Sequence, residues 1–322
     1  MKELNWGILG LGSIATSFTV AFTAKDAKIY AVGSRSIEKA EQFAKDHGIE
    51  KAYGSYDDLL NDPSINVVYI ATPHSHHADL IMKSLAHGKH VLCEKAIVMN
   101  TKQLDAAMKL AKEKELVLAE AMTIYHMPLY QELKKRTADG ALGKLKMIQV
   151  SFGSLKEADP LNRFFNKDIA GGALLDIGTY ALSFARFFLS SQPKEVLTTV
   201  NFFETGVDEE AGIILKNDEN EMATIAITFR AKMPKQGVVA FEKGYFTVTD
   251  FPRADEATFT HPDGSVERIQ AGDKSQALTY EICHFNEIVR TKNDTSSLNL
   301  THDVMEIMDT LREKWDLNFD FE

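Results

Sequence analysis

The sequence predicts an α/β fold with a parallel N-terminal sheet, followed by a second domain whose strands pair mainly antiparallel. Over the first 121 residues short apolar segments alternate with helical patterns, which implies parallel strands joined by crossover helices. Beyond that point β-rich segments follow one another without long helices between them, which favours antiparallel pairing. A length of 322 residues suits two domains, and we place them at 1–121 and 122–322.

The elements of the first domain follow from short apolar segments bounded by glycine or polar residues. Strands that are buried in a parallel sheet should be apolar on both faces, and the segment VVYIAT meets that demand. The predicted strands are 4–10, 27–34, 67–72, 90–94 and 116–120. The predicted helices are 13–24, 37–47, 75–87 and 101–115.

The second domain opens with a helix over 129–138 and a strand over 144–151, and a long helical pattern covers 172–189. Helical patterns at 277–290 and 302–315 close the chain. Between them the apolar and β-branched residues predict strands at 195–204, 211–215, 222–230, 237–241 and 245–249.

Composition excludes several classes of function. The net charge of −10 argues against binding to a nucleic-acid backbone. No run of eighteen apolar residues occurs, so no membrane span is expected. The two cysteines, Cys93 and Cys283, have neither metal-ligand spacing nor a disulfide framework, and we expect a reducing, cytoplasmic location.

The segment from Gly10 to Ala15 matches the G-x-G-x-x-G/A pattern, with a predicted strand before it and a helix after it. Gly10 permits a tight turn, and Gly12 lets backbone N–H groups approach a pyrophosphate. With Ser13 and Ile14 they would place the anion at a helix N-terminus. The pattern therefore predicts a dinucleotide site, against the simpler alternative of a plain turn between strand and helix.

The end of the second strand indicates which dinucleotide is preferred. An NAD-selective site usually has an acidic residue there, bonded to the ribose, whereas this chain has Ser34 and Arg35. A guanidinium suits a phosphate dianion, and Lys39 adds a positive charge one helical turn later. We therefore predict that NADP(H) is preferred and that NAD(H) remains usable; the alternative is a solvated surface arginine.

Thr72 ends the strand at 67–72, and Pro73 is followed by three histidines within four positions, His74, His76 and His77. Loops at the carboxyl ends of parallel strands carry the ligand in open α/β sheets, so we predict that the histidines line the nicotinamide side. No carboxylate or cysteine completes a set of metal ligands, and no metal is predicted. Ser75 is expected to cap the next helix.

Glu94 and Lys95 end the strand at 90–94. An ammonium at this edge of the sheet would face the same crevice, where it could lower the pKa of a hydroxyl or carry a proton. Spacing alone leaves Lys95 equally well explained as a solvated surface lysine.

Asp176 and Tyr180 lie four residues apart in the helical segment after the double glycine at 171–172, and therefore on one face of a helix. A carboxylate beside a phenol on an otherwise apolar helix is a candidate acid/base pair. On pattern alone, a capping aspartate and a packing tyrosine are the simpler interpretation.

Together these residues resemble the glucose–fructose oxidoreductase/inositol dehydrogenase superfamily. The marks occur in the family's order over nearly the whole chain: GILGLGSIA, AVGSRS, IATPHSHHAD, CEKA, GALGKLKMIQVSFG and AGGALLDIGTY. The branch that they resemble most is that of dimeric dihydrodiol dehydrogenase and NADP-linked xylose dehydrogenase. The resemblance implies a Rossmann domain, then an α+β domain with a large, mostly antiparallel sheet that commonly forms the dimer face.

The resemblance also implies catalytic roles for Lys95, Asp176 and Tyr180, and a substrate-bordering loop around Arg163. Tyr125 stands in a run that lines the cleft in some members, although packing explains it equally well. The family usually has proline after the lysine, whereas this chain has Ala96. An alanine frees φ and restores an N–H, so we expect a less constrained backbone around Lys95.

We therefore expect an enzyme that moves a hydride between NADP and a carbon bearing a hydroxyl in a sugar, polyol or dihydrodiol, acting as a homodimer. The proton would pass to Lys95 or Tyr180. One rival is an NADPH-dependent reductase of dicarbonyl or anhydro-sugar substrates. The other is a non-catalytic regulator that senses dinucleotide, although such proteins tend to lose the residues retained here.

Overall fold

The computed structural model describes residues 3–293, 297–320 and 322, and the chain divides into two compact units. Unit 1 comprises residues 1–122 and 278–298, and unit 2 comprises 123–277 and 299–322. The first boundary lies one residue from the predicted one. The prediction that everything after residue 121 belongs to the second domain is wrong for 278–298, which returns to unit 1.

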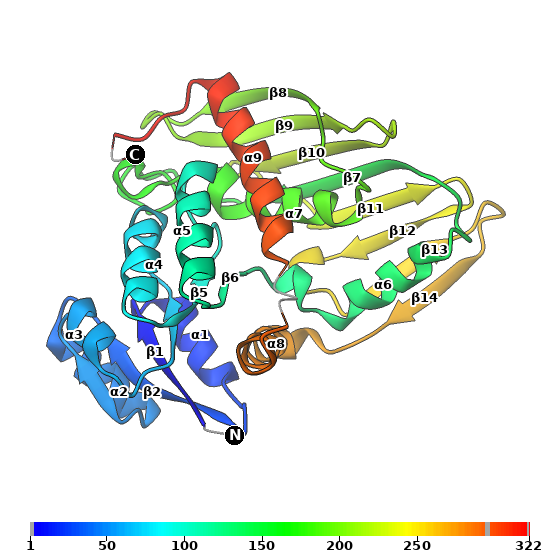
Figure 1. Cartoon of the computed structure of the whole chain (residues 1–322). Coiled ribbons are helices and arrows are strands. Elements are labelled where there is room, and N and C mark those ends of the chain that lie inside the picture. The colour runs from blue at the N-terminus through cyan, green and yellow to red at the C-terminus, as the bar shows by residue number, and fades with distance from the viewer. Residues whose placement is uncertain (1–2, 294–296, 321) are drawn as a thin grey trace. The chain divides into compact units, whose positions relative to one another are not determined.

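Unit 1 is built on a parallel sheet of six strands in the order β3-β2-β1-β4-β5-β6 (Figure 1), which confirms the predicted parallel sheet. Its strands are β1 (Leu4–Leu9), β2 (Ala27–Gly33), β3 (Lys51–Tyr53), β4 (Val67–Ile70), β5 (His90–Glu94) and β6 (Leu118–Ala121). The connecting helices are α1 (Ser13–Ala21), α2 (Ile37–His47), α3 (Tyr56–Asn61), α4 (His77–Ala86) and α5 (Thr101–Glu113).

The core of unit 1 explains why these segments fold as they do. All four residues of β4 are buried, as expected for a strand covered on both faces. One cluster of buried side chains joins the sheet to α1, α2 and the returning helix α8 (Ala277–Thr291). Elsewhere in the unit, α4 packs beside α5 and against β5.

Helix α8 belongs to unit 1 because it completes an aromatic cluster around Trp6. The Trp6 ring lies 5.7 Å from Phe18, 5.5 Å from Phe22 and 5.4 Å from Phe285 of α8. Its indole Nε1–H donates to Asn286 at 3.0 Å, so the polar edge of the buried tryptophan is also satisfied. Periodicity revealed this helix, but its packing partner lies some 280 residues away.

Unit 2 is built on a sheet of eight strands in the order β14-β13-β12-β11-β7-β10-β9-β8. All neighbours are antiparallel except β7 and β10, which confirms the mainly antiparallel pairing. The strands are β7 (Leu145–Gly153), β8 (Glu195–Phe202), β9 (Asp208–Lys216), β10 (Met222–Thr228), β11 (Gln236–Phe241), β12 (Gly244–Thr249), β13 (Glu256–Thr260) and β14 (Val266–Gln270).

One face of this sheet is covered by α6 (Pro128–Ala138), α7 (Thr179–Phe188) and α9 (Leu298–Trp315) (Figure 1). Tyr130 of α6 packs on Phe184 of α7, and Trp315 of α9 donates to Thr198 of β8 at 3.1 Å. Burial alternates along β9 and β10, as it does when one face of a sheet is covered and the other is not. The uncovered face is called the open face below.

The structure adds short elements that the periodicity did not reveal, namely β3, α3, β13 and β14. The segment before α7 is also not α-helical as predicted: Leu174–Gly178 forms a π-helical turn. Among the described residues, no helix combines the length and the apolarity needed to cross a membrane.

Candidate functional site

The glycine-rich turn stands between β1 and α1, at the carboxyl edge of the parallel sheet. Gly10 has φ +90°, and a Cβ there would lie 2.8 Å from the carbonyl oxygen of Ala71, so only glycine fits. A Cβ on Gly12 would meet nothing within 4 Å, which leaves open space beside the first turn of α1. Ala15 is fully buried. Ser13 is exposed and Ile14 half-buried at the start of this helix.

The residues after β2 present a cation to the same edge. Arg35 is exposed, and none of the described residues forms an ion pair or hydrogen bond with its guanidinium. Ser34 is only 8% exposed, and its Oγ accepts the N–H of Ser36 at 3.3 Å. Lys39 is exposed on the first turn of α2. The structure therefore leaves Arg35 available to an anion, with Ser34 mainly shaping the turn.

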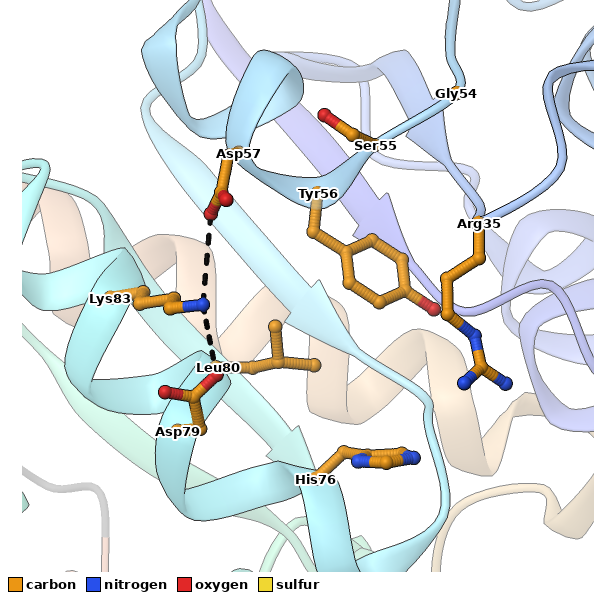
Figure 2. Close-up of a pocket in the computed structure, with 9 residues that line it drawn as sticks. All are labelled: Arg35, Gly54, Ser55, Tyr56, Asp57, His76, Asp79, Leu80 and Lys83. Carbon is orange, nitrogen blue, oxygen red and sulfur yellow. Dashed lines mark ion pairs between the residues drawn. The ribbon is translucent and has the colours of Figure 1, made fainter.

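A cavity of about 320 Å³ opens beside Arg35. Figure 2 shows Tyr56 at its centre, with the phenol hydroxyl directed toward the Arg35 side chain, and Lys83 on the opposite wall with two aspartates. The cavity combines the apolar surfaces of Tyr56 and Leu80 with charged side chains, as expected of a ligand pocket. It is lined by Arg35, Gly54, Ser55, Tyr56, Asp57, His76, Asp79, Leu80 and Lys83.

Two of the three histidines after β4 hold backbone rather than facing open space. His77 is fully buried, with Nδ1 2.9 Å from the Ala96 carbonyl and Nε2 2.8 Å from that of Thr72. His74 Nε2 lies 3.2 Å from the Lys95 carbonyl. Both ring nitrogens of His77 lie against carbonyl oxygens, so neither nitrogen faces open space. His76 is half-buried and lines the cavity.

Ser75 does not cap α4, contrary to the prediction. It lies inside a 3₁₀ turn, His74–His76, and the residue that precedes α4 is His76. The buried Oγ of Ser75 has no hydrogen-bond partner among the described residues. The tight turn after Pro73 delays the start of the helix by two residues from the predicted position.

The loop after β5 that carries Lys95 is held at several points. Lys95 itself is half-buried, and the peptide bond to the fully buried Ala96 is cis. His74 and His77 contact the carbonyls of residues 95 and 96, and Glu120 accepts the N–H of Ile97 at 3.1 Å. Side chains from β6 and the β4 loop thus hold this backbone where alanine replaces the family's usual proline.

Glu94 carries a second link between the strand ends. Its carboxylate accepts a hydrogen bond from the hydroxyl of Tyr69 in β4. Tyr69 is fully buried, and burial raises its pKa well above the usual range, with the charges of Glu94 and Glu281 adding to the shift. The phenol is therefore a neutral donor that orients Glu94, the residue immediately before Lys95.

Taken together, the carboxyl edge of the unit 1 sheet has the chemistry of a dinucleotide site. The first turn of α1 offers N–H groups and a positive dipole, Arg35 offers a phosphate-binding fork, and Lys95 ends the strand beyond the switch point between β1 and β4. Thr72 and Pro73 lie at the end of β4, between these groups. The residues present fit the pyrophosphate of a nicotinamide dinucleotide.

In unit 2 the helical segment after the double glycine carries the other candidate pair. Asp176 and Tyr180 are half-buried, whereas every other residue from 171 to 185 is buried. The π turn that contains Asp176 widens the helix just before Tyr180, and such turns are frequent at functional sites. The structure thus leaves these two polar side chains accessible on one segment.

Asp208 fixes the entry of that segment, and pattern reasoning did not find it. Its Oδ2 accepts the N–H of Leu174 at 2.6 Å. Gly172 has φ +126°, and a Cβ there would lie 2.3 Å from Asp208 Oδ1, which explains the glycine. Burial raises the pKa of Asp208 to about 6, against the opposing effects of backbone N–H groups and Arg312. No local sequence signal links β9 to this helix.

The two remaining candidates in unit 2 differ in exposure. Arg163 is exposed, and its guanidinium stacks 4.2 Å from the ring of Phe164. Tyr125 is only 3% exposed, and its ring packs against Phe187. The geometry of Tyr125 is that of a packing residue, whereas Arg163 stays available in its loop.

Comparison with known proteins matches both halves of the chain to family models. Residues 4–122 match the model described as an oxidoreductase family with an NAD-binding Rossmann fold. Residues 130–247 match the GFO/IDH/MocA C-terminal domain.

Among curated relatives, the trans-1,2-dihydrobenzene-1,2-diol dehydrogenase of Xenopus tropicalis is 36% identical over 76% of this chain and 74% of its own. The Homo sapiens protein of the same name is 34% identical over 75% and 73%. Two solved structures share the fold: the 3-ketoreductase KijD10 of Actinomadura kijaniata with NADP and TDP-benzene, and a levoglucosan dehydrogenase with NADH and levoglucosan. Each structure has a TM-score of 0.87 and is 21% identical in sequence. The KijD10 match covers 97% of this chain, the levoglucosan dehydrogenase match covers 98% of it, and each covers 98% of the matched chain.

Proposed function

The chain belongs to the GFO/IDH/MocA oxidoreductase family, and on that premise we propose that it transfers a hydride between NADP(H) and a sugar, polyol or dihydrodiol. The reacting carbon alternates between CH–OH and C=O. The dihydrodiol dehydrogenases, which are 36% and 34% identical over 76% and 75% of this chain, support this class of substrate.

One observation carries the proposal: Lys95 directly follows β5, at the same sheet edge as the Gly10 turn and Arg35. Parallel strands bring their carboxyl ends to one edge, and ligands of such sheets bind there. His74, His77 and Glu120 hold the backbone of residues 95–97 at that edge, which supports a fixed starting point for the Lys95 side chain.

We assign the proton chemistry to Lys95 and Tyr180. The nicotinamide, when bound, accepts or supplies the hydride. In oxidation one of the two side chains takes the hydroxyl proton as the hydride leaves carbon, and in reduction the same group returns it. Asp176 orients the substrate or tunes the charge on Lys95.

Kinetics of single and double variants test this assignment. Lys95→Ala should lower turnover about 10²- to 10⁴-fold, the usual contribution of acid/base assistance, while NADPH binding stays largely intact. Tyr180→Phe should lower turnover too, and the double variant should lose less than the product of the two effects if they serve one proton. Unchanged turnover in Lys95→Ala would remove Lys95 from the mechanism.

A substrate panel tests the reaction class and its direction. Sugars and dihydrodiols with NADP, set against ketones, dicarbonyls and anhydro-sugars with NADPH, separate a dehydrogenase from a reductase. Tight NADPH binding without turnover on any of them would instead indicate a dinucleotide sensor. pH–rate profiles of the two single variants identify which group holds the proton.

The preference for NADP(H) over NAD(H) is part of the proposal, supported by the exposed and unengaged Arg35. Binding titrations with both cofactors measure it. Arg35→Asp should weaken NADP binding far more than NAD binding, because a carboxylate repels the 2′-phosphate. Equal losses for both cofactors would refute this role for Arg35.

We also propose that the enzyme is a homodimer joined through the open face of the unit 2 sheet. Large apolar side chains are exposed there on strands whose register places them on one face, as is typical of an interface. Leu197→Glu should shift sedimentation toward monomer, whereas Val20→Glu on unit 1 should not. The residues are Met147 (38% exposed), Leu197 (63%), Ile214 (39%), Tyr245 (40%) and Val266 (62%).

We place the enzyme in the cytoplasm. Cys93 and Cys283 are free thiols, which suits a reducing compartment. Imaging of the tagged full-length protein in its native cell tests the location.

A further inference from the structure

The cavity beside Arg35 (Figure 2) has two walls of different charge, and the difference indicates how it selects a ligand. On one wall Lys83 lies 3.1 Å from Asp79 and 3.9 Å from Asp57. The single positive charge of Lys83 offsets one of the two carboxylates, so this wall keeps a net charge of about −1. It therefore repels a phosphate and favours N–H donors.

The other wall is positive. Arg35 forms no ion pair or hydrogen bond with any residue that the structure describes. Its charge is therefore uncompensated within the pocket, and a phosphate dianion entering the cavity is drawn to this side. Fork-shaped guanidinium groups bind phosphate through two N–H groups but leave a further phosphate oxygen to be satisfied.

Tyr56 stands where that further donor is needed. It begins α3 and is half-buried, and Figure 2 shows its hydroxyl directed toward Arg35. No described residue accepts or donates a hydrogen bond at this hydroxyl. Burial raises the pKa of Tyr56, against the opposing charge of Arg35, so the phenol keeps its proton at neutral pH.

Resting on the NADP(H) preference set out above, we propose that Tyr56 is a second cofactor-discriminating residue. Its hydroxyl and the Arg35 guanidinium together bind the 2′-phosphate, while the adenosine moiety occupies the cavity over Leu80. Discrimination is thus shared by two elements, the β2–α2 turn and the start of α3. The aspartate-bearing wall opposite keeps the phosphate at the Arg35 side.

Isothermal titration with half-cofactors isolates this contact. The probes are adenosine 2′,5′-bisphosphate and 5′-AMP, which differ only in the 2′-phosphate, together with NADP and NAD. Tyr56→Phe keeps the ring and removes one hydrogen bond to a charged group. It should weaken the bisphosphate about 10- to 100-fold and change 5′-AMP affinity by less than about twofold.

Tyr53→Phe is the matched control. Tyr53 also lies near the start of α3, but its hydroxyl donates to Asp62 at 2.6 Å and does not line the cavity. Loss of that hydroxyl should lower the melting temperature without changing the ratio of bisphosphate to 5′-AMP affinity. Melting curves of Tyr56→Phe confirm that the variant is folded.

The outcomes separate the inference from its premise. If Tyr56→Phe weakens both probes equally, or neither, the role of Tyr56 is overturned. If the wild type binds NADP and NAD equally and Arg35→Asp changes nothing, the NADP preference itself fails. A third outcome overturns the role of Tyr56 but leaves the NADP preference standing. In that case the wild type prefers NADP, Arg35→Asp loses the preference, and Tyr56→Phe keeps it.

Discussion

His77 shows how a buried polar side chain can organise a site without touching a ligand. It bridges the Thr72 and Ala96 carbonyls and so ties the end of β4 to the loop that carries Lys95. The sequence motif predicted that the histidines face the nicotinamide. For His77 the structure indicates that the ring supports the backbone instead. Supporting the backbone and facing the nicotinamide both require an imidazole near the strand end, so the sequence motif does not distinguish these two roles.

Replacing His77 with phenylalanine should therefore affect both stability and turnover. The carbonyl that accepts from the imidazole N–H would lose its partner, at about 1–3 kcal/mol, and turnover should fall more than NADPH affinity because the loop that carries Lys95 loses its support. Thermal unfolding, kcat and the Kd for NADPH measure these effects. His87→Gln is the control, since His87 is exposed and bonds only within α4; equal effects in both variants would contradict the assignment.

At the scale of single residues, the sequence predicted those side chains whose role depends only on neighbouring positions in the chain. The Gly10 turn and the exposed Arg35 follow from chemistry within a few positions of the chain. Tyr56 and Asp208 were missed because their partners are remote: Asp208 binds a backbone N–H 34 positions away. Pairing at that distance depends on tertiary packing, which no motif within one segment encodes.

The entry of the Asp176–Tyr180 segment depends on a contact between two elements. The carboxylate of Asp208, the first residue of β9, accepts from the N–H of Leu174, and Gly172 leaves room for it. In the sequence, the double glycine at 171–172 directly precedes this helical segment. The structure adds the reason, since a Cβ at 172 would occupy the place of a carboxylate oxygen.

Gly172→Ala should consequently destabilise unit 2. The backbone conformation at φ +126° costs an alanine about 1–3 kcal/mol, and the clash with Asp208 adds to that. Turnover should fall as the helix entry moves. Chemical denaturation and steady-state kinetics give the readout, with Gly140→Ala as control: its φ is +71° but its Cβ would meet open space. Similar losses of stability in both variants would show that backbone strain, and not the clash with Asp208, causes the destabilisation.

Elements were predictable where burial leaves a clear apolar or periodic pattern, as in the four-residue strands β4 and β6, which are buried throughout. The structure has α2 over the predicted range of 37–47, because Ser36 and Gly48 mark both ends. The strands β3, β13 and β14 have five residues or fewer, and β14 has only one buried position. The π turn was invisible because its residues also suit an α-helix.

At the scale of the molecule, the two units should respond to acid in opposite directions. In unit 1, burial lowers the pKa values of His77, His90 (to about 4) and His284. The unfolded chain then takes up protons below about pH 6.5 before the folded unit does, so stability falls with pH. In unit 2, Asp208 has a pKa raised to about 6, and its folded form gains protons first.

Lowering the pH from about 7.5 to 5 should therefore weaken unit 1 relative to unit 2. Hydrogen exchange read by mass spectrometry, corrected for the intrinsic pH dependence, resolves the units separately. Protection should decline first in peptides from β4 and β5 and persist in those from β9 and α7. A uniform decline over both units would contradict the expected difference.

The return of α8 to unit 1 constrains how this chain can be divided. The polypeptide passes from one unit to the other three times, near residues 122, 277 and 298. A fragment cut after residue 122 would remove Phe285, one aromatic neighbour of Trp6, and Asn286, the hydrogen-bond partner of its indole N–H. Neither unit is one continuous stretch of the chain. A gene fusion or recombination that exchanges unit 1 must therefore include α8 as well as the N-terminal residues.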